Sequence, residues 1–179
     1  DGTVESKQTF QGKNDESSWA RGQAWAIYGY TACFRETNDS IFLNFAKDIA
    51  DMIMDRVKTE DAIPYWDYDA PVTKETPRDV SAASVTASAM SELSTMVPDG
   101  QNYLDYAEKI LKSLSSDAYL AKVGDNQGII LMHSVGSLPN GSEIDTPLNY
   151  ADYYYLEALK RFMELKKLKV ENGELRVIQ

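Results

Sequence analysis

The chain has 179 residues, of which 43% are hydrophobic and 26% charged, a composition typical of a folded globular protein and not of a disordered one. Its formal net charge of −10 argues against a nucleic-acid-binding surface, which needs a basic footprint. An acidic ligand would have to be held by local arginine or lysine residues. We therefore expect one domain over residues 1–179 that does not bind nucleic acid.

Several kinds of site and location are disfavoured by what the sequence contains. One histidine and one cysteine are too few for a metal site built from these ligands, so we expect no metal. No segment is apolar over the length that a membrane-spanning helix needs. The chain starts at Asp1 with no initiator methionine and no recognisable signal peptide, so we expect a piece of a longer polypeptide or a processed product.

A first helix is predicted from about residues 15–18 to Arg35, after a polar loop. Apolar side chains occupy nearly every face of this segment, so it should be buried on all sides. Arg21 and Trp25 lie four residues apart and share a face. A guanidinium beside an indole ring suits a ligand with a carboxylate and a flat ring. The alternative is an arginine paired with a buried acid and a tryptophan packed in the core.

The middle of the chain predicts an outer helix, a loop and a buried helix. Residues 40–57, capped by Ser40, carry their apolar side chains on one face only. A proline- and aromatic-rich loop over about 59–77 either lines a binding surface or packs its rings on the core. Asp79 then caps a helix of small residues, which can approach its neighbours closely and should be buried.

The last third repeats this alternation. Residues 102–114 predict another one-sided helix, and the apolar run 129–132 predicts an extended segment that leads into a turn-rich loop. Thr146 is expected to cap the final helix, with Pro147 at its first position. Residues 168–178 predict a small C-terminal β-hairpin.

Buried helices that begin near Ser18, Asp79 and Thr146 thus alternate with one-sided helices. This pattern fits one wall of an all-α toroid of helical hairpins. Three buried helices have only two outer partners here, so we expect about half of a closed helical barrel with one face of the set uncovered.

Several multi-residue motifs resemble the C-terminal half of unsaturated glucuronyl hydrolases, glycoside hydrolase family 88. The resemblance covers about residues 10–165 and implies an (α/α)6 barrel, in agreement with the alternation of helices. The motifs are, in chain order, Ser18-Trp19-Ala20-Arg21-Gly22-Gln23-Ala24-Trp25, Pro64-Tyr65-Trp66-Asp67-Tyr68-Asp69-Ala70-Pro71, Pro77-Arg78-Asp79-Val80-Ser81-Ala82, His133-Ser134-Val135-Gly136, and Gly141-Ser142-Glu143-Ile144-Asp145 leading into Tyr150-Ala151-Asp152-Tyr153-Tyr154.

The resemblance implies a glycosidase that removes a terminal 4,5-unsaturated uronic acid from oligosaccharides left by polysaccharide lyases. In such enzymes a carboxyl group protonates the C4–C5 double bond, water adds at C5, and the resulting hemiketal collapses. No cofactor is implied. The two catalytic aspartates of the family belong to its N-terminal half, so we expect no catalytic residue in this chain and no hydrolase activity from the chain alone.

The same resemblance implies substrate-binding residues. Arg21 would bind polar or anionic sugar groups and Trp25 would stack on a ring, with Gln11 and Gln23 as further candidates. The family commonly has histidine or arginine eleven residues before the arginine, where this chain has Phe10.

Ser134 and Ser137 match part of a Ser-x-x-Ser-x-Lys pattern with which some members recognise sulfate. Pro139 stands at the lysine position, which leaves Lys13 as a substitute. The missing lysine therefore argues against sulfate recognition by this pattern.

For other polar residues of the motifs we expect structural roles and not roles in catalysis or binding. We expect Asp79 to be a helix cap and not a catalytic acid. Asp67 and Asp69 are expected as loop acids near a rim, and His133 as a loop histidine whose hydrogen bonds are satisfied.

Two other functions stay open. One is a non-catalytic helical carbohydrate-binding module that stacks sugars on Trp25, Trp66 and the tyrosine-rich last helix. The other is an unsaturated rhamnogalacturonyl hydrolase. In each case the expected partner is an oligosaccharide, which for the leading function carries an unsaturated uronic acid. The missing N-terminal half or a second copy of the chain would cover the inner-helix face. We expect a bacterial cytoplasmic or periplasmic protein and not a membrane protein.

Overall fold

The computed structural model of the protein describes residues 2–171. In this range the chain forms five α-helices and one short 3-10 helix, and the described loops between them are joined by isolated β-bridges. The helices are α1 (Ala20–Thr37), α2 (Ser40–Arg56), α3 (Val80–Leu93), α4 (Gln101–Leu114), η1 (Asn126–Gly128) and α5 (Asn149–Glu171).

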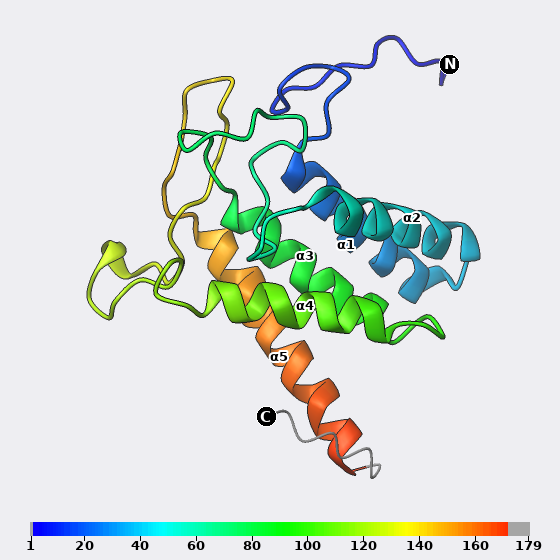
Figure 1. Cartoon of the computed structure of the whole chain (residues 1–179). Coiled ribbons are helices and arrows are strands. Elements are labelled where there is room, and N and C mark those ends of the chain that lie inside the picture. The colour runs from blue at the N-terminus through cyan, green and yellow to red at the C-terminus, as the bar shows by residue number, and fades with distance from the viewer. Residues whose placement is uncertain (1, 172–179) are drawn as a thin grey trace.

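Helix α3 is the centre of the fold, with α1 packed on one side of it and α5 on the other (Figure 1). Helix α2 packs on α1, and α4 packs on α3 and α5. The expected alternation of three inner helices (α1, α3 and α5) with two outer helices (α2 and α4) is confirmed. In the view of Figure 1 the connection between α2 and α3 lies mostly above the helices, and the first part of the connection between α4 and α5 lies at the left, beside α4.

Small side chains make the central position of α3 possible. Every residue of α3 except Glu92 is buried, and most are alanine or serine. Small residues allow neighbouring helices to approach closely, and the buried hydroxyls of Ser84 and Ser91 donate to carbonyls one turn earlier in the same helix. The prediction of a buried helix over this segment is confirmed.

The outer helices bury one face each, as their sequence period predicts. Ala46, Ala50 and Ile53 form the buried face of α2. In α4 the buried residues recur at intervals of three and four, among them Ala107 and Ile110. Burying an isoleucine side chain of this kind contributes about 1.5–3 kcal/mol to folding.

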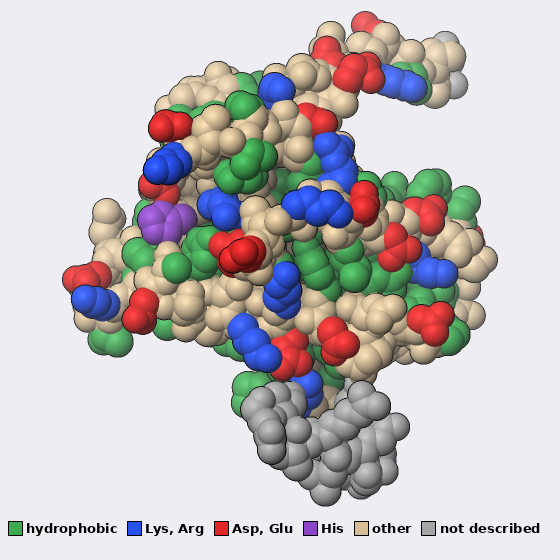
Figure 2. Space-filling view, in the orientation of Figure 1, with side chains coloured by type: hydrophobic (Ala, Val, Ile, Leu, Met, Phe, Trp, Pro, Cys, Tyr) green, Lys and Arg blue, Asp and Glu red, His purple; other side chains and the backbone are tan. Residues whose placement is uncertain are grey.

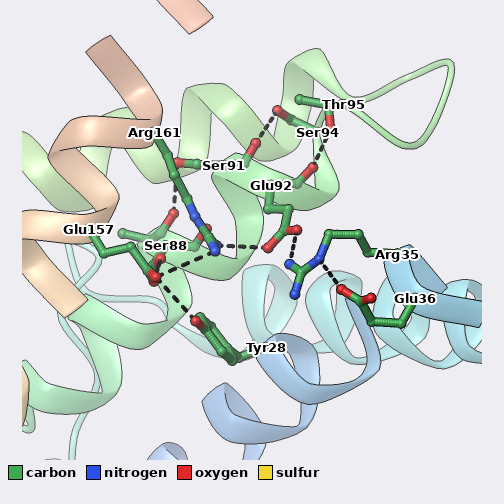
Figure 3. A network of polar contacts seen from close by, with 11 residues as sticks. Tyr28, Arg35, Glu36, Ser88, Ser91, Glu92, Ser94, Thr95, Glu157 and Arg161 are labelled. Carbon is green, nitrogen blue, oxygen red and sulfur yellow. Dashed lines mark hydrogen bonds and ion pairs between the residues drawn. The ribbon is translucent and has the colours of Figure 1, made fainter. Parts of the chain in front are cut away.

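A polar network joins the three inner helices (Figure 3). Glu92 of α3 accepts a hydrogen bond from Arg35 of α1 and lies 2.9 Å from the guanidinium of Arg161 of α5. Glu157 of α5 accepts a hydrogen bond of 3.2 Å from the hydroxyl of Tyr28. Burial, with the nearby Glu157 carboxylate, raises the pKa of Tyr28 to about 12. This network fixes the positions of α1, α3 and α5 relative to one another.

Helix α1 begins at Ala20, slightly later than predicted from residues 15–18. The backbone N–H of Ala20 donates to the carbonyl of Trp66 at 3.0 Å, so the aromatic loop caps the helix. Ser17, one of the expected caps, donates instead to the carboxylate of Asp67 at 2.7 Å. The helix start is therefore set by a loop distant in sequence.

Two predicted caps are wrong. Asp39 and not Ser40 caps α2, because its carboxylate accepts the N–H of Ile41 at 3.0 Å and Ser40 is already helical. Thr146 does not cap α5, which begins at Asn149. The backbone of Thr146 instead pairs with that of Ser134 in both directions, at 2.9 Å each.

Two of the inner helices, α1 and α5, are less completely covered than their composition predicts. The buried residues of α1 lie on one side, while Gly29 and Cys33 are exposed. On α5 the side chains of Tyr153, Leu156 and Met163 are 60%, 51% and 56% exposed. The uncovered face expected across all three inner helices is therefore found on α1 and α5 only, because α3 is buried between its neighbours.

The end of the chain differs from the prediction where it is described. Helix α5 continues to Glu171, so residues 168–171 are helical and do not form a strand. The rest of the predicted hairpin lies outside the described residues. No helix of the described part has the length and apolarity needed to span a membrane.

Candidate functional site

The N-terminal ends of the three inner helices bring Arg21 of α1, the Asp79 cap of α3 and Tyr150 of α5 together. The Arg21 guanidinium donates to the Asp79 carboxylate at 3.0 Å and to the Ser81 hydroxyl at 3.2 Å. It also lies 5.5 Å from the centre of the Tyr150 ring, within the range of a cation–π contact. We refer to Arg21, Asp79, Ser81 and Tyr150 as the inner polar cluster.

Arg21 also holds a loop. Its guanidinium donates to the carbonyl oxygens of Val135 and Gly136, the latter at 2.6 Å. Gln11 donates to the same Gly136 carbonyl at 3.0 Å. Arg21 is only 3% exposed. Arg21 is therefore paired with a buried acid, which was one of the two alternatives that the sequence left open. Sugar binding by Arg21 stays a prediction.

Asp79 has the structural role expected for it. Its carboxylate caps α3 by accepting the N–H groups of Ser81 and Ala82, and the residue is fully buried. Burial raises the pKa of the Asp79 carboxyl, while the charge of Arg21 opposes this shift. The pair is a buried ion pair with several additional hydrogen bonds, an arrangement that supports a fixed local geometry.

A group of aromatic side chains adjoins the inner polar cluster. Trp25, one turn after Arg21, packs edge-on against Tyr154 of α5 at 5.0 Å between ring centres and against Tyr28 at 6.4 Å. Tyr153 contacts Tyr154 at 4.9 Å. Trp25 and Tyr154 are both half-buried, so their rings retain some solvent-facing surface. Partly exposed aromatic rings beside hydrogen-bonding groups can stack on a sugar ring.

The loop held by Arg21 has a tight local geometry. A Cβ atom added at Gly136 would lie 2.2 Å from Oε2 and 2.6 Å from Cβ of Glu143. Glu143 itself has a left-handed backbone with φ of 52°. The pKa of Tyr150 is raised chiefly by burial, with a contribution from Glu143. Glu143 therefore lies close to both Gly136 and the inner polar cluster.

The remaining predicted binding residues lie in different environments. Gln23 is half-buried and comes two residues after Arg21, which places it on another face of α1. Ser134 is fully buried, and within the described structure its hydroxyl has no hydrogen-bond partner. The Ser137 hydroxyl accepts from the Asn140 side chain at 2.8 Å. Lys13 donates its ammonium to the carbonyl of Asp69, at 2.7 Å. The structure therefore gathers Arg21 and Gln11 around one carbonyl but gives Lys13 a different partner.

Asp67 and Asp69, the two aspartates of the aromatic loop, hold loops in place. Asp67 is 1% exposed and accepts the backbone N–H groups of Lys13 and Asp69, both at 2.9 Å. Asp69 pairs with Arg56 at 2.6 Å, and this contact lowers the pKa of the Asp69 carboxyl. No group of three or more potential metal ligands occurs in the part of the chain that the structure describes.

The sequence does not predict Tyr150, Tyr154 and Glu143 as site residues. Tyr150 and Tyr154 belong to the tyrosine-rich last helix, whose composition is the one sequence feature that indicates a stacking surface. Glu143 carries no local sign of its position, because its proximity to Gly136 depends on how residues 134–146 fold back.

Curated relatives match the chain over most of its length. An unsaturated glucuronyl hydrolase of Formosa agariphila is 46% identical over 165 residues, which are 92% of this chain and 41% of that protein. An unsaturated chondroitin disaccharide hydrolase of Streptococcus agalactiae is 35% identical over 162 residues, 86% of this chain and 39% of that protein. The chain thus spans about two fifths of the length of the curated relatives it matches. No family model matches it.

Solved structures agree with these relatives. An unsaturated glucuronyl hydrolase specific for heparin superposes with a TM-score of 0.90 at 57% identity, covering 93% of this chain and 45% of that one. A mutant of the Streptococcus agalactiae unsaturated glucuronyl hydrolase complexed with dGlcA-GalNAc6S superposes with a TM-score of 0.79 at 35% identity, covering 86% of this chain and 42% of that one. The helices described above follow the α/α-toroid fold of these proteins.

Proposed function

Because the chain belongs to the unsaturated glucuronyl hydrolase family, glycoside hydrolase family 88, we propose that it forms part of a glycosidase acting on unsaturated oligosaccharides. The proposed reaction releases a terminal 4,5-unsaturated uronic acid from products of polysaccharide lyases. The observation that carries this proposal is the agreement of sequence and structure with such enzymes over nine tenths of the chain.

We propose that this chain binds and positions the sugar while the catalytic carboxyl groups lie elsewhere in the whole protein. In the reaction a proton is added to C4 and water to C5, and the hemiketal then opens. Three aspartates near the site have structural roles: Asp79 is buried with Arg21, Asp67 holds the N-terminal loop and Asp69 pairs with Arg56. This supports a binding role for the chain.

The proposed sugar contacts are the partly exposed aromatic rings of Trp25 and Tyr154, next to the inner polar cluster. Gln11 and Glu143 border the same cluster through Gly136. Arg21 would act on the sugar indirectly, by holding Tyr150 and the 134–146 loop in position. It would contact the sugar directly only if its guanidinium became exposed in the whole protein. Gln23, Ser134 and Ser137 stay predictions of the family resemblance.

The exposed apolar residues of α5, Tyr153, Leu156 and Met163, support a further part of the proposal. Large apolar patches on a soluble protein mark contact surfaces. We propose that the N-terminal half of the barrel covers this face. A second copy of the chain is the competing occupant.

Turnover tests the proposal. The ultraviolet absorbance of an unsaturated disaccharide would be followed with the 179-residue chain alone and with a polypeptide extended by its upstream half. We expect loss of absorbance with the extended polypeptide only. Turnover by the chain alone would contradict the assignment of the catalytic acids, whereas binding without turnover by either protein would support a non-catalytic carbohydrate-binding module.

A further inference from the structure

A groove of about 380 Å³ lies outside the inner polar cluster, between residues 74–78, residues 118–119 and the segment around His133 and Asp145. Figure 2 shows the single histidine of the chain at this edge of the molecule, with basic and acidic side chains close around it. His133 directly precedes the 134–146 loop that Arg21 holds. The groove and the inner polar cluster are therefore connected by the short backbone stretch from His133 to Gly136.

His133 is held in a defined orientation at the groove. Its Nδ1 lies 2.6 Å from Oδ1 of Asp145, and its ring contacts Tyr119 edge-on at 6.2 Å. His133 and Asp145 both have left-handed backbones, with φ of 66° and 51°. Such conformations are uncommon outside glycine and concentrate at ligand sites. With Nδ1 donating to Asp145, Nε2 faces away from that carboxylate, and in the doubly protonated ring it donates to an anionic ligand.

Arg78, which lines the groove, has more N–H donors than its neighbours accept. Arg78 donates to the carbonyl of Ile63, contacts Asp61 at 3.4 Å and lies over the Tyr65 ring at 4.6 Å. Asp61 also accepts the hydroxyl of Tyr119. An arginine has five N–H donors, so Arg78 retains capacity for a further acceptor.

Lys74 adds a positive charge to the same groove, whereas Glu75 beside it adds a negative one. Asp145 is engaged by His133, and its side chain is 60% exposed. Lysine, arginine and the single histidine thus gather in one groove of a chain whose net charge is −10. The ammonium of Lys74 and the remaining N–H groups of Arg78 are donors that suit an anionic oxygen ligand.

We propose that this groove is an accessory subsite that binds an anionic substituent, sulfate or carboxylate, of the oligosaccharide through Lys74, Arg78 and His133. It differs from the Ser134–Ser137 pattern, in which proline replaces the lysine and Ser134 is buried. The identity of the ligand as part of an oligosaccharide rests on the proposed function. Anion binding in the groove does not.

The single histidine allows a direct test. The imidazole resonances of His133 in the full chain would be followed by NMR during titration with sodium sulfate, sodium glucuronate and a saturated sulfated disaccharide, with ionic strength held constant by chloride. We expect a saturable shift of the His133 resonances with sulfate and with glucuronate that chloride does not produce. Lys74→Gln should weaken binding about threefold, the size expected for one exposed charge.

Lys109→Gln, which removes an exposed lysine on α4, is the matched control and should leave the affinity unchanged. The proposal is overturned if sulfate and glucuronate shift the His133 resonances no more than chloride does, or if both lysine variants weaken binding equally. Equal affinity for inorganic sulfate and the sulfated disaccharide would overturn the oligosaccharide part alone. No bond is cleaved in these titrations, so their outcome is independent of the turnover test.

Discussion

Arg21 and Asp79 form a buried ion pair between the N-terminal ends of α1 and α3, with 3.0 Å between Nη1 and Oδ2. Their side chains are 4% and 0% exposed. The same guanidinium reaches two carbonyls of the 134–146 loop, so one residue joins two inner helices and a loop.

Removing the arginine should therefore destabilise the chain strongly. Arg21→Met leaves the Asp79 charge buried without its partner, and we expect a loss of about 3–5 kcal/mol in the free energy of unfolding. Urea denaturation followed by circular dichroism measures it. Lys58→Met is the control, because Lys58 pairs with Asp55 at an exposed position and should change stability by less than about 1 kcal/mol. Equal effects of the two changes would contradict the structural importance of the buried pair.

Two glycines should respond in opposite ways to alanine. Gly136→Ala places a Cβ against Glu143, so we expect destabilisation by about 1–3 kcal/mol. Gly29→Ala adds a Cβ within α1 where nothing lies within 4 Å, and helix propensity should stabilise the chain by about 0.5–1 kcal/mol. Thermal unfolding of the two variants measures both effects. A stable Gly136→Ala variant would show that the 134–146 loop adapts.

The carboxyl of Asp61 should make stability depend on acid pH. Burial alone would raise its pKa, but hydrogen bonds from Tyr119 and the Ile63 N–H and the charge of Arg78 outweigh burial, so the pKa is lowered. A lowered pKa in the folded state stabilises the protein above the unfolded pKa of about 3.9, and this contribution is lost as the pH falls toward the folded value.

Asp61→Asn should therefore reduce the loss of stability that wild-type protein shows between about pH 5 and pH 3. Urea midpoints measured across that range check this. A variant whose stability falls as steeply as that of the wild type would show that other carboxyl groups dominate.

The exposed face of α5 should govern association. Leu156→Arg places a charge in the apolar stripe of Tyr153, Leu156 and Met163 without disturbing buried contacts. We expect the isolated chain to keep its secondary structure but to lose association with the N-terminal half or with a second copy, as measured by analytical ultracentrifugation. Ile41→Arg on α2 changes an equally exposed residue away from this face and should have no effect on association. Unchanged association of Leu156→Arg would exclude this face as the contact surface.

Sequence periodicity and local chemistry predicted that the five α-helices exist, but not where α1 and α5 begin. The one-sided pattern of residues 40–57 and the small residues after Asp79 depend only on near neighbours, so they predicted α2 and α3 well. The Thr146 cap was wrong because a tertiary contact with Ser134 outweighs the local signal. The Arg21–Asp79 pair joins residues far apart in the chain, so the sequence could offer a buried acid as one alternative without identifying which acid.

The candidate site likewise has residues that the sequence indicates and residues that only the folded chain brings together. Arg21 and Trp25 stood out because their types and spacing are visible in the sequence. Glu143, by contrast, lies against Gly136 only because of the left-handed turns of the 134–146 loop. The groove at His133 also depends on loops that meet only in the folded chain.

Binding of an unsaturated disaccharide to the 179-residue chain, measured by titration calorimetry, tests most directly whether the chain holds the sugar on its inner-helix face. We predict saturable binding that Trp25→Ala weakens about tenfold, as loss of an aromatic stacking contact of about 1.4 kcal/mol would do. Tyr30→Ala, which removes a half-buried ring of α1 that stacks on Phe45, should leave the affinity unchanged. Equal affinities of the wild type and Trp25→Ala would contradict a sugar-binding site at Trp25.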